Sequence, residues 1–510
     1  MAQLIGVVQS LASLHSLLMI VLGVSMGLLV GVLPGLGPTP AIALLVPLTF
    51  NLPTDQALLL LSALYLATQY GGSITAILIG IPGDAANVAT VFDGYEFTKR
   101  GEPGKALGIS ITAATVGGAI GIVFLAVLAV PLSALSLSFG PPEFFALGIV
   151  GLSVISSVAG SSLLRGFVGG LIGLLLALPG MDPLSGDTRL TFGLPLLQDG
   201  IHLVPFVLGF FAVSGALDQL EKFGRETLKR DTVLSGRRPT RKELMALMPT
   251  IGRSSVIGAA VATVPGHGAT IVSLLCYELE RRFWGKGRLF GTGVPQGVAA
   301  PEAAAAASVG GALIPLLTLG IPGSASTSVI LAALTMHGIP IGESVLATHP
   351  RLAYTLVLGL VIALIVILIV GYFGVKFWVR VASLPTKIVV IGILVLSVVG
   401  AFAVRSDLDD VWIMFGCGLL GFVLRKLKIP PAPVVMAFIL EPIIEMAFRR
   451  SLMISGGNPE IFVSSTLAIA LLLLGAVSFA LPIFFDQRRR ADSPDSPALA
   501  PAVETQAADR

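Results

Sequence analysis

The chain has 510 residues, of which 55% are hydrophobic and 12% are charged, with a mean hydropathy of +0.93 and a formal net charge of +3. This composition excludes an ordinary water-soluble domain and predicts a polytopic membrane protein. The small positive charge sits in short loops, so it does not indicate a nucleic-acid partner. The two cysteines, Cys276 and Cys417, have neither metal-ligand spacing nor a disulfide framework, and we interpret them as helix-packing residues.

The N-terminal segment is apolar and has no basic flank. The first charged residue is Asp55 and the first basic one is Lys99. A secretory signal peptide opens with a positively charged region, which is missing here. We therefore expect the first apolar segment to remain in the protein as a membrane helix.

Short glycine-rich motifs recur halfway along the chain in the same order. Their shifts grow slowly, from 231 residues for the first pair to 240, 244 and 248 for the next three. The matched pairs are 34–39 (PGLGPT) with 265–270 (PGHGAT), 80–83 with 320–323 (both GIPG), 148–154 with 392–398, and 170–173 with 418–421. An ordered set of this kind predicts that one membrane unit has been duplicated.

Loop charges predict that the two copies have opposite orientations in the membrane. In the second copy, 221–242, 278–288 and 376–387 are basic, whereas the matching loops of the first copy carry no Lys or Arg. The trend reverses after the GIPG motifs, where 99–105 is basic and 337–350 is not. Because Lys and Arg collect in cytoplasmic loops, opposite charge in matched loops indicates inverted repeats.

One pair of residues does not follow this pattern. Arg449 and Arg450 fall on the predicted outer side, so the number of helices near the C-terminus stays open. The final helix, expected at Ile461–Phe485, ends at the basic run 488–490, which indicates a cytoplasmic C-terminus.

The fold class that follows is an all-α, polytopic helical membrane protein with two inverted-topology repeats, broken or re-entrant helices and about 12–15 membrane segments. We expect four parts along the chain. They are membrane repeat 1 at 1–220, a basic cytoplasmic linker at 221–248, membrane repeat 2 with the final helix at 249–486, and a disordered cytoplasmic tail at 487–510, which is rich in Pro, Ala and Asp.

The Pro-Gly motifs predict breaks inside membrane helices. Proline removes a backbone N–H and clashes with the preceding turn, while glycine tolerates positive φ. Unpaired backbone groups must face protein or water within a bilayer, and a new helix N-terminus attracts a carboxylate. Paired breaks in inverted repeats are typical of secondary transporters, whose binding site lies between the repeats.

Candidate substrate ligands are the glycines and small polar residues in or beside the four breaks. They are Gly35, Gly37, Thr39, Ser73, Thr75, Gly83, Asn87, Gly266, His267, Gly268, Thr270, Gly323, Ser324, Ser326 and Thr327. Asp84 is the candidate coupling-ion ligand, because an ionisable side chain in an apolar segment is costly to bury unpaired. Glu302 is a similar case that we expect near a water boundary, and no metal site is assigned.

Structural alternatives exist for each of these residues. Glycine, serine and threonine also let membrane helices pack closely. Asp84 directly follows Pro-Gly, a position that suits a helix cap. A lone histidine such as His267 in apolar sequence is more often a structural residue than a ligand or proton relay.

Three long strings resemble the large permease subunit of the tripartite tricarboxylate transporters. They are 31–50, 70–97 continued by 99–108, and 297–338, and the resemblance runs from about Gly23 to 455–457. It implies a bacterial inner-membrane permease that works with a small membrane subunit and a periplasmic substrate-binding protein. Such a permease takes up citrate or another di- or tricarboxylate with Na⁺ or H⁺ as the coupling ion and needs no other cofactor. Family members usually carry an Asn pair where this chain has Ala305 and Ala306, which leaves the substrate open.

Two other classes of protein remain as alternatives. An intramembrane serine hydrolase would use Ser324 as nucleophile and His337 or His349 as base. A channel-like protein would conduct without saturation. No P-loop string occurs, so this chain does not itself hydrolyse ATP, and we expect a transporter rather than an enzyme.

Overall fold

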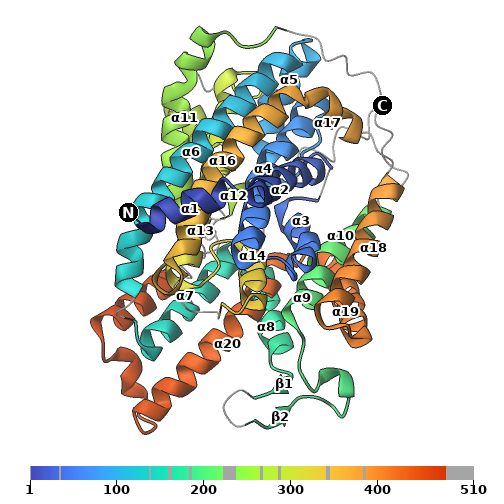
Figure 1. The fold of residues 1–510 in the computed structure, drawn as a ribbon. Helices are drawn as coiled ribbons and strands as arrows, with labels where there is room; N and C mark the ends of the chain where they lie inside the picture. Colours follow the sequence, from blue (N-terminus) through green and yellow to red (C-terminus); the bar gives the residue numbers. More distant parts are fainter. Residues whose placement is uncertain are drawn as a thin grey trace, which may run out of the picture.

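The computed structural model describes residues 2–33, 36–136, 139–158, 163–182, 186–221, 237–264, 268–284, 289–339, 345–382 and 386–477 (Figure 1). The described part is almost entirely helical. A single short antiparallel hairpin, β1 (Gly180–Met181) and β2 (Thr188–Arg189), is the sheet that it contains. Eight described helices are long and apolar enough to cross a membrane, and five more are apolar but shorter. The predicted polytopic, all-α class is confirmed.

The first half of the chain contains the elements up to α10. In order they are α1 (Ala2–Leu11), α2 (Leu14–Gly31), α3 (Pro38–Leu45), η1 (Pro47–Thr49), α4 (Thr54–Ile79), η2 (Ala85–Asn87), α5 (Val88–Lys99), α6 (Pro103–Ser136), α7 (Pro141–Val158), α8 (Leu163–Ala177), the hairpin, η3 (Pro195–Leu197), α9 (Leu203–Val207), η4 (Leu208–Val213) and α10 (Ser214–Glu221). The last three follow one another without a gap and form one membrane-length helix whose middle, η4, is a π-helix.

The second half continues from α11. Its elements are α11 (Arg241–Ala262), α12 (Ala269–Leu279), η5 (Glu280–Trp284), α13 (Pro295–Leu319), α14 (Ala325–Met336), α15 (Val345–Thr348), α16 (Pro350–Phe373), α17 (Val375–Ala382), α18 (Thr386–Arg405), α19 (Leu408–Lys426), α20 (Pro431–Ile454), η7 (Pro459–Val463) and a last apolar helix, Thr466–Val477.

Several predicted boundaries differ from the observed ones. The expected linker 221–248 becomes helical at Arg241, because Thr240 and Glu243 form a capping box that starts α11. The expected loop 278–288 is helical as far as Trp284. The final helix begins at Thr466 rather than Ile461, since a 3₁₀ turn precedes it. The linker residues 222–236, the end of the final helix and the tail 487–510 lie outside the described residues.

Matching glycine contacts show that the two halves share one architecture. A Cβ at Gly27 of α2 would lie 2.6 Å from the Leu64 carbonyl oxygen of α4, and one at Gly258 of α11 would lie 2.7 Å from the Ala304 carbonyl oxygen of α13. Gly27 and Gly258 differ by the shift of the first motif pair, and Leu64 and Ala304 by the shift of the second. Each half therefore packs its first long helix on its second at an equivalent point, where only glycine allows the backbones to approach so closely.

The equivalent helices α4 and α13 run in opposite directions. Ser73, in the second half of α4, contacts Glu302 near the start of α13, whereas Tyr65, earlier in α4, contacts Ser324 just beyond the end of α13. Both helices are almost wholly buried and form the centre of the molecule. The repeats are thus inverted relative to each other, as the loop charges predict.

The outer helices are exchanged between the halves. In Figure 1, α20 of the second half lies with α7 and α8 of the first, while α9, α10, α18 and α19 form a separate group. Gly173 of α8 packs against Val434 of α20, and Gly209 of η4 packs against Met414 of α19. Each outer bundle therefore combines helices of both repeats.

The basic segments of both halves meet at one end of the molecule. Lys105 pairs with Glu243 at 2.8 Å, Arg238 donates to the Tyr372 hydroxyl at 2.7 Å, and Arg100 contacts the Thr292 carbonyl. These contacts join the starts of α6 and α11 to the end of α16 and the loop before α13. A common end is what the predicted cytoplasmic side requires.

Arg449, which breaks the loop-charge pattern, belongs to an ion-pair network. Its guanidinium lies 2.5 Å from Asp182 and 3.2 Å from Glu445. Arg189 of the hairpin donates two hydrogen bonds to Glu445, at 2.5 and 2.6 Å. The charge of Arg449 is therefore compensated within the protein. For this reason Arg449 need not mark the cytoplasmic side, as an unpaired loop Arg would.

Asp93 of α5 fastens the first repeat to the second. Its carboxylate is fully buried; Oδ1 accepts hydrogen bonds from the N–H groups of Gly291, Gly293 and Val294 at 3.0, 2.8 and 2.8 Å, and Oδ2 accepts one from the Tyr277 hydroxyl at 2.9 Å. The three N–H groups immediately precede α13. The anion therefore satisfies unpaired donors at a helix N-terminus, where negative charge is stabilised.

Candidate functional site

The first GIPG motif makes a re-entrant break. Gly80 ends α4 in the left-handed conformation with φ 71°. The chain then runs back along α4 until the Gly83 N–H donates to the Gly72 carbonyl at 3.2 Å. From there α5 sets out again in the direction of α4, and its Thr98 hydroxyl donates to the Ile77 carbonyl at 2.7 Å. The predicted interruption is confirmed, and it lies well inside the protein.

The second GIPG motif repeats this geometry. Gly320 ends α13 with φ 63°, and Gly323 packs on Ala312, the residue equivalent to Gly72. Ser324 then caps α14, its Oγ accepting the Thr327 N–H at 3.2 Å while Thr327 Oγ1 accepts the Ser324 N–H at 2.7 Å. Positive φ thus occurs at the first glycine of each motif. Gly83 and Gly323, at the fourth position, are needed for close approach of the backbone instead.

The other two motifs also interrupt helices. α2 ends at Gly31 and α3 begins at Pro38, while α11 ends at Ala262 and α12 begins at Ala269. Gly37 has φ 44°, and Gly268 is the N-cap of α12. Of the predicted ligands in these two motifs, Gly35, Gly266 and His267 lie outside the described residues.

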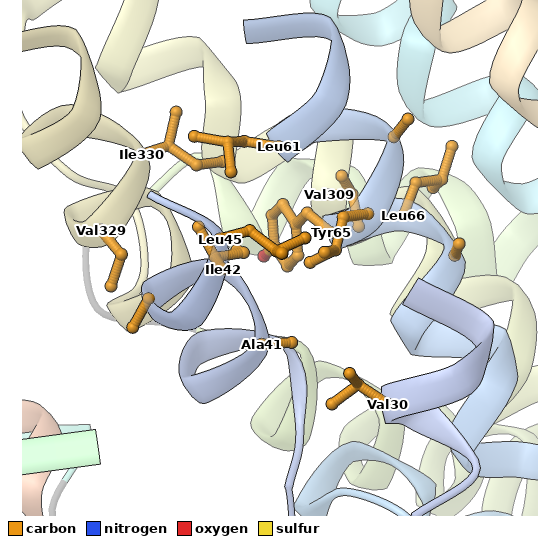
Figure 2. Packing of buried hydrophobic residues seen from close by; sticks show 14 of the residues in the cluster. Val30, Ala41, Ile42, Leu45, Leu61, Tyr65, Leu66, Val309, Val329 and Ile330 are labelled. Carbon is orange, nitrogen blue, oxygen red and sulfur yellow. The ribbon is translucent and has the colours of Figure 1, made fainter. Parts of the chain in front are cut away.

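Five hydroxyl side chains from both repeats form a group at the centre, which we call the hydroxyl cluster. It consists of Thr39, Tyr65, Ser324, Ser326 and Thr327. Thr39 Oγ1 and Ser326 Oγ are 2.8 Å apart, and the Tyr65 hydroxyl lies 3.3 Å from Ser324 Oγ. Figure 2 shows Tyr65 among buried apolar residues that include Ile42, Leu45 and Val309. The cluster therefore joins the break before α3 to the break before α14.

Asp84 stands at the edge of this centre. It is half-buried, lies near Tyr65, and places Oδ1 2.6 Å from the point that a Cβ on Gly37 would occupy. Asp84 precedes η2, but its side chain makes no capping hydrogen bond of good geometry, although the Ala85 and Ala86 N–H groups are close. Asp84 and Gly37 thus bring together the two breaks of repeat 1.

Glu302 is not at a water boundary, contrary to the expectation. Its side chain is 3% exposed and accepts hydrogen bonds from the hydroxyls of Ser73 at 2.5 Å, Thr90 at 2.5 Å and Ser110 at 2.9 Å. Asn87 Nδ2 in turn donates to Ser73 Oγ at 2.9 Å. Two predicted substrate ligands therefore lie beside Glu302: Ser73 bonds to it directly, and Asn87 is linked to it through Ser73. We call Glu302, Ser73, Asn87, Thr90 and Ser110 the Glu302 cage.

Sequence reasoning did not find the cage, although one signal was present. Glu302 is a carboxylate in a long run of alanine and other small residues, a pattern that marks functional candidates in membrane helices. Thr90 and Ser110 carry no such signal, since single hydroxyls are common in membrane helices. The Thr75 hydroxyl donates to the Gly72 carbonyl at 3.2 Å, and the Thr270 backbone carbonyl accepts a bond from the Ser273 hydroxyl at 3.0 Å. Neither contact joins these residues to the hydroxyl cluster.

At the pseudo-symmetric position, the described residues do not repeat the hydroxyl cluster. The repeat shifts pair Tyr65 with Ala305 and Ser326 with Ala86, and these two alanines pack together with Ala269 in a small apolar contact. Ala305 is therefore the pseudo-symmetric partner of Tyr65. The two halves of the centre have become chemically different.

A cavity of about 350 Å³ lies away from the breaks, between α7, α8 and the last helix. Apolar residues dominate its lining, among them Ile149, Phe167, Leu171 and Leu472. It contains none of the predicted ligands and offers little to hold an anion, so we do not assign the substrate to it.

The hydrolase alternative does not fit the geometry when His337 is the base. Ser324 precedes α14 and His337 follows it, so the two residues are about 18 Å apart along a helix of this length. The Ser324 hydroxyl is instead engaged by Thr327 and Tyr65. A nucleophile and its base must be within hydrogen-bond reach, which these residues are not.

Comparison with known proteins agrees with this architecture. The profile described as "Tripartite tricarboxylate transporter TctA family" matches residues 17–436. An uncharacterised 52.8 kDa protein of Agrobacterium vitis, from the TAR-I region 3′ of ttuC′, is 34% identical over 472 residues, which cover 92% of this chain and 93% of that relative. An uncharacterised protein from the TAR-II region of the same organism, also 3′ of ttuC′, is 30% identical over 235 residues, or 46% of this chain and 97% of that relative. No solved structure matches the chain. A family match over most of a chain with inverted repeats and four broken helices leads to one conclusion: the protein belongs to the TctA family of the tripartite tricarboxylate transporters.

Proposed function

We propose that this chain is the permease subunit of a binding-protein-dependent secondary transporter that imports a citrate-like di- or tricarboxylate together with a cation. The main observation in support of this function is the contact between Thr39 and Ser326, which joins helix breaks of the two inverted repeats at the centre of the molecule. Broken helices that meet between inverted repeats are how secondary transporters bind solutes near the bilayer midplane. Family membership supports the same class.

The chemistry of the breaks suits an anion. No Lys or Arg occurs in any of the four break motifs, so a carboxylate would be held by backbone N–H groups at the starts of α3, α5, α12 and α14 and by the hydroxyl cluster. Asp84 is the candidate ligand of the coupling ion, Na⁺ or H⁺, since a carboxylate beside an anion site favours a cation. The remaining predicted glycines permit the close approach of substrate or backbone.

The assembly and its location follow from the family. We infer a bacterial inner-membrane protein that works with a small membrane subunit and a periplasmic substrate-binding protein, with its C-terminus in the cytoplasm. The gathering of basic segments at one end supports this orientation, because Lys and Arg favour the cytoplasmic side.

Reconstitution tests the proposed function directly. The purified chain, together with the two partner subunits from the same organism, is placed in proteoliposomes and supplied with labelled citrate and other di- and tricarboxylates. We expect saturable uptake that depends on a cation gradient, and counterflow when the vesicles are preloaded with unlabelled substrate. Flux without saturation or counterflow would show a channel instead. Labelling of Ser324 by a fluorophosphonate probe would show a hydrolase.

A further inference from the structure

The Glu302 cage holds a negative charge without a positive partner. Among the described residues, no ion pair reaches Glu302, and its hydrogen bonds come from neutral hydroxyls. All three hydroxyls are placed to donate to the carboxylate oxygens of Glu302. A carboxylate buried this deeply is costly unless hydrogen bonds satisfy its charged form or a cation or a proton neutralises it. Asp93 has the N–H groups before a helix for this purpose, whereas Glu302 has only neutral hydroxyls.

Additional oxygen atoms near the cage have no hydrogen-bond partner. Gln69 Oε1, Asn87 Oδ1 and the Tyr70 hydroxyl are buried and unsatisfied. Asn87 belongs to the cage, and its side-chain amide also donates to the backbone carbonyl of Gln69. Gln69 and Tyr70 lie on α4 about one turn before the cage residue Ser73. Buried polar groups almost always find a partner, so these oxygens point to a missing ligand. Oxygen donors of this kind, with one carboxylate, suit a hard cation.

The cage is also absent from the other half of the pseudo-symmetric centre. The 240-residue shift pairs Glu302 with Ser62, Gln69 with Val309, Ser73 with Leu313 and Thr90 with Ile330. Ser62 donates only to carbonyls of its own helix, and the other three equivalents are buried apolar residues. The second helix of the first repeat, α4, therefore folds with an uncharged serine at the position equivalent to Glu302. A structural need shared by both repeats does not explain Glu302.

From these observations we propose that the Glu302 cage binds a further monovalent coupling cation, either Na⁺ or a proton, at a site separate from the candidate coupling-ion ligand Asp84. That the cation is coupled to uptake rests on the proposed transport function. The binding of the cation to the cage does not depend on that function. Ser73 and Asn87 supply the structural link, because Asn87 ends η2 directly after the first re-entrant break. Binding of the cation would thereby be coupled to the position of the break that faces the substrate.

The test uses the purified full-length chain and the cation alone. Binding of ²²Na⁺ is measured at neutral pH, and protonation of buried carboxyl groups is followed by infrared difference spectra between acid and neutral pH. The variants are Glu302→Gln, which removes the charge but keeps the shape, and Thr90→Val, which removes one hydroxyl donor and leaves the carboxylate. Ser62→Ala, at the pseudo-symmetric position, is the matched control.

For a Na⁺ site, Glu302→Gln should lower the ²²Na⁺ stoichiometry by one ion per chain, Thr90→Val should weaken the affinity for that ion about tenfold, and Ser62→Ala should bind like wild type. For a proton site, wild type shows a titrating carboxyl band that is lost in Glu302→Gln and displaced in Thr90→Val. The proposal is overturned if Glu302→Gln leaves both signals as in wild type, or if wild type shows neither signal. Should Glu302→Gln fail to fold, an unchanged signal in Thr90→Val overturns it equally.

These assays contain no carboxylate, so their outcome is independent of the uptake experiment. Intact cation signals with no substrate counterflow would refute the transport function and leave the cation site standing. Saturable counterflow with unchanged cation signals in Glu302→Gln would refute the cation site alone.

Discussion

The hydroxyl oxygens of Thr39 and Ser326 lie 2.8 Å apart, although 287 residues separate them in the chain. Thr39 belongs to the first turn of α3 and Ser326 to the first turn of α14, so the contact joins two helix N-termini from opposite repeats. The first turn of α14 has unpaired N–H groups at Ala325 and Ser326, whereas in α3 the prolines at 38 and 40 have none and Thr39 supplies the N–H. An anion bound there would meet groups from both repeats at once.

The first prediction concerns this contact. Thr39→Val and Ser326→Ala should each lower the rate of uptake, and the double variant should lose little more than either single one, because both remove the same hydrogen bond. We expect a coupling of about 0.5–1.5 kcal/mol in thermal or chemical unfolding of the purified variants. Strictly additive effects would mean that the two hydroxyls act independently, and would argue against a shared site.

Valine at either fourth-position glycine of the GIPG motifs should abolish uptake. In Gly83→Val the new Cβ would collide with the backbone of Gly31 and Gly72, and in Gly323→Val it would lie 2.5 Å from the Ala312 carbonyl oxygen. Such backbone clashes should also lower the melting temperature. Gly252→Ala, on α11 with open space around the Cβ position, should keep normal uptake. Wild-type uptake by both valine variants would exclude the breaks from transport.

Asp84→Asn separates two roles of that carboxylate. As a coupling-ion ligand, Asp84 should matter for the cation dependence of uptake more than for the apparent affinity for substrate. The lack of a well-formed cap bond makes a purely structural effect of the substitution small. Cation titrations of uptake decide the matter, and a wild-type response of the Asn variant would remove Asp84 from the site.

Asp93→Ala should destabilise the protein strongly. It leaves the N–H groups of Gly291, Gly293 and Val294 and the Tyr277 hydroxyl without their acceptor. We expect a loss of about 3 kcal/mol, since even one hydrogen bond to a charged group contributes about 1.5–3 kcal/mol. Tyr277→Phe removes only one of the four bonds and should cost about 1–2 kcal/mol. Thermal unfolding in one detergent ranks the two variants. Equal melting temperatures would show that Asp93 does not hold α5 to α13.

The orientation of the protein is open to direct measurement. Single cysteines at Ser235, Ser344 and Ala491, in a background without Cys276 and Cys417, can be treated with an impermeant maleimide on spheroplasts with an intact inner membrane. We expect labelling at Ser344 and protection at Ser235 and Ala491. The reverse pattern at Ser235 and Ser344 would invert the assigned topology.

The sequence predicted the class of the fold and all four breaks, because proline and glycine act locally on the backbone. The inverted arrangement also followed, since loop charge is a property of short segments. The exchange of α20 and α9–α10 between the bundles did not, because it depends on which apolar faces pack best, and apolar helices offer few sequence marks for that choice.

The site was predicted only in part. Thr39, Ser324, Ser326 and Thr327 come together as residues of one centre, but Ser73 and Asn87 face Glu302, which the sequence placed near water. Burial of a carboxylate is set by the surrounding helices, so the Glu302 cage needed the coordinates of α4, α5, α6 and α13 together. Tyr65 was missed because a tyrosine within a long apolar helix resembles an ordinary core residue.

The exchange of outer helices has a consequence for biosynthesis. α7 and α8 leave the ribosome about 250 residues before their packing partner α20, which at 5–20 residues per second is a delay of roughly ten to fifty seconds. During that time glycine-lined faces such as that of Gly173 have only lipid against them. The nascent chain therefore passes through a long-lived, half-assembled state, and completion of the first bundle waits for nearly the last membrane segment to be inserted.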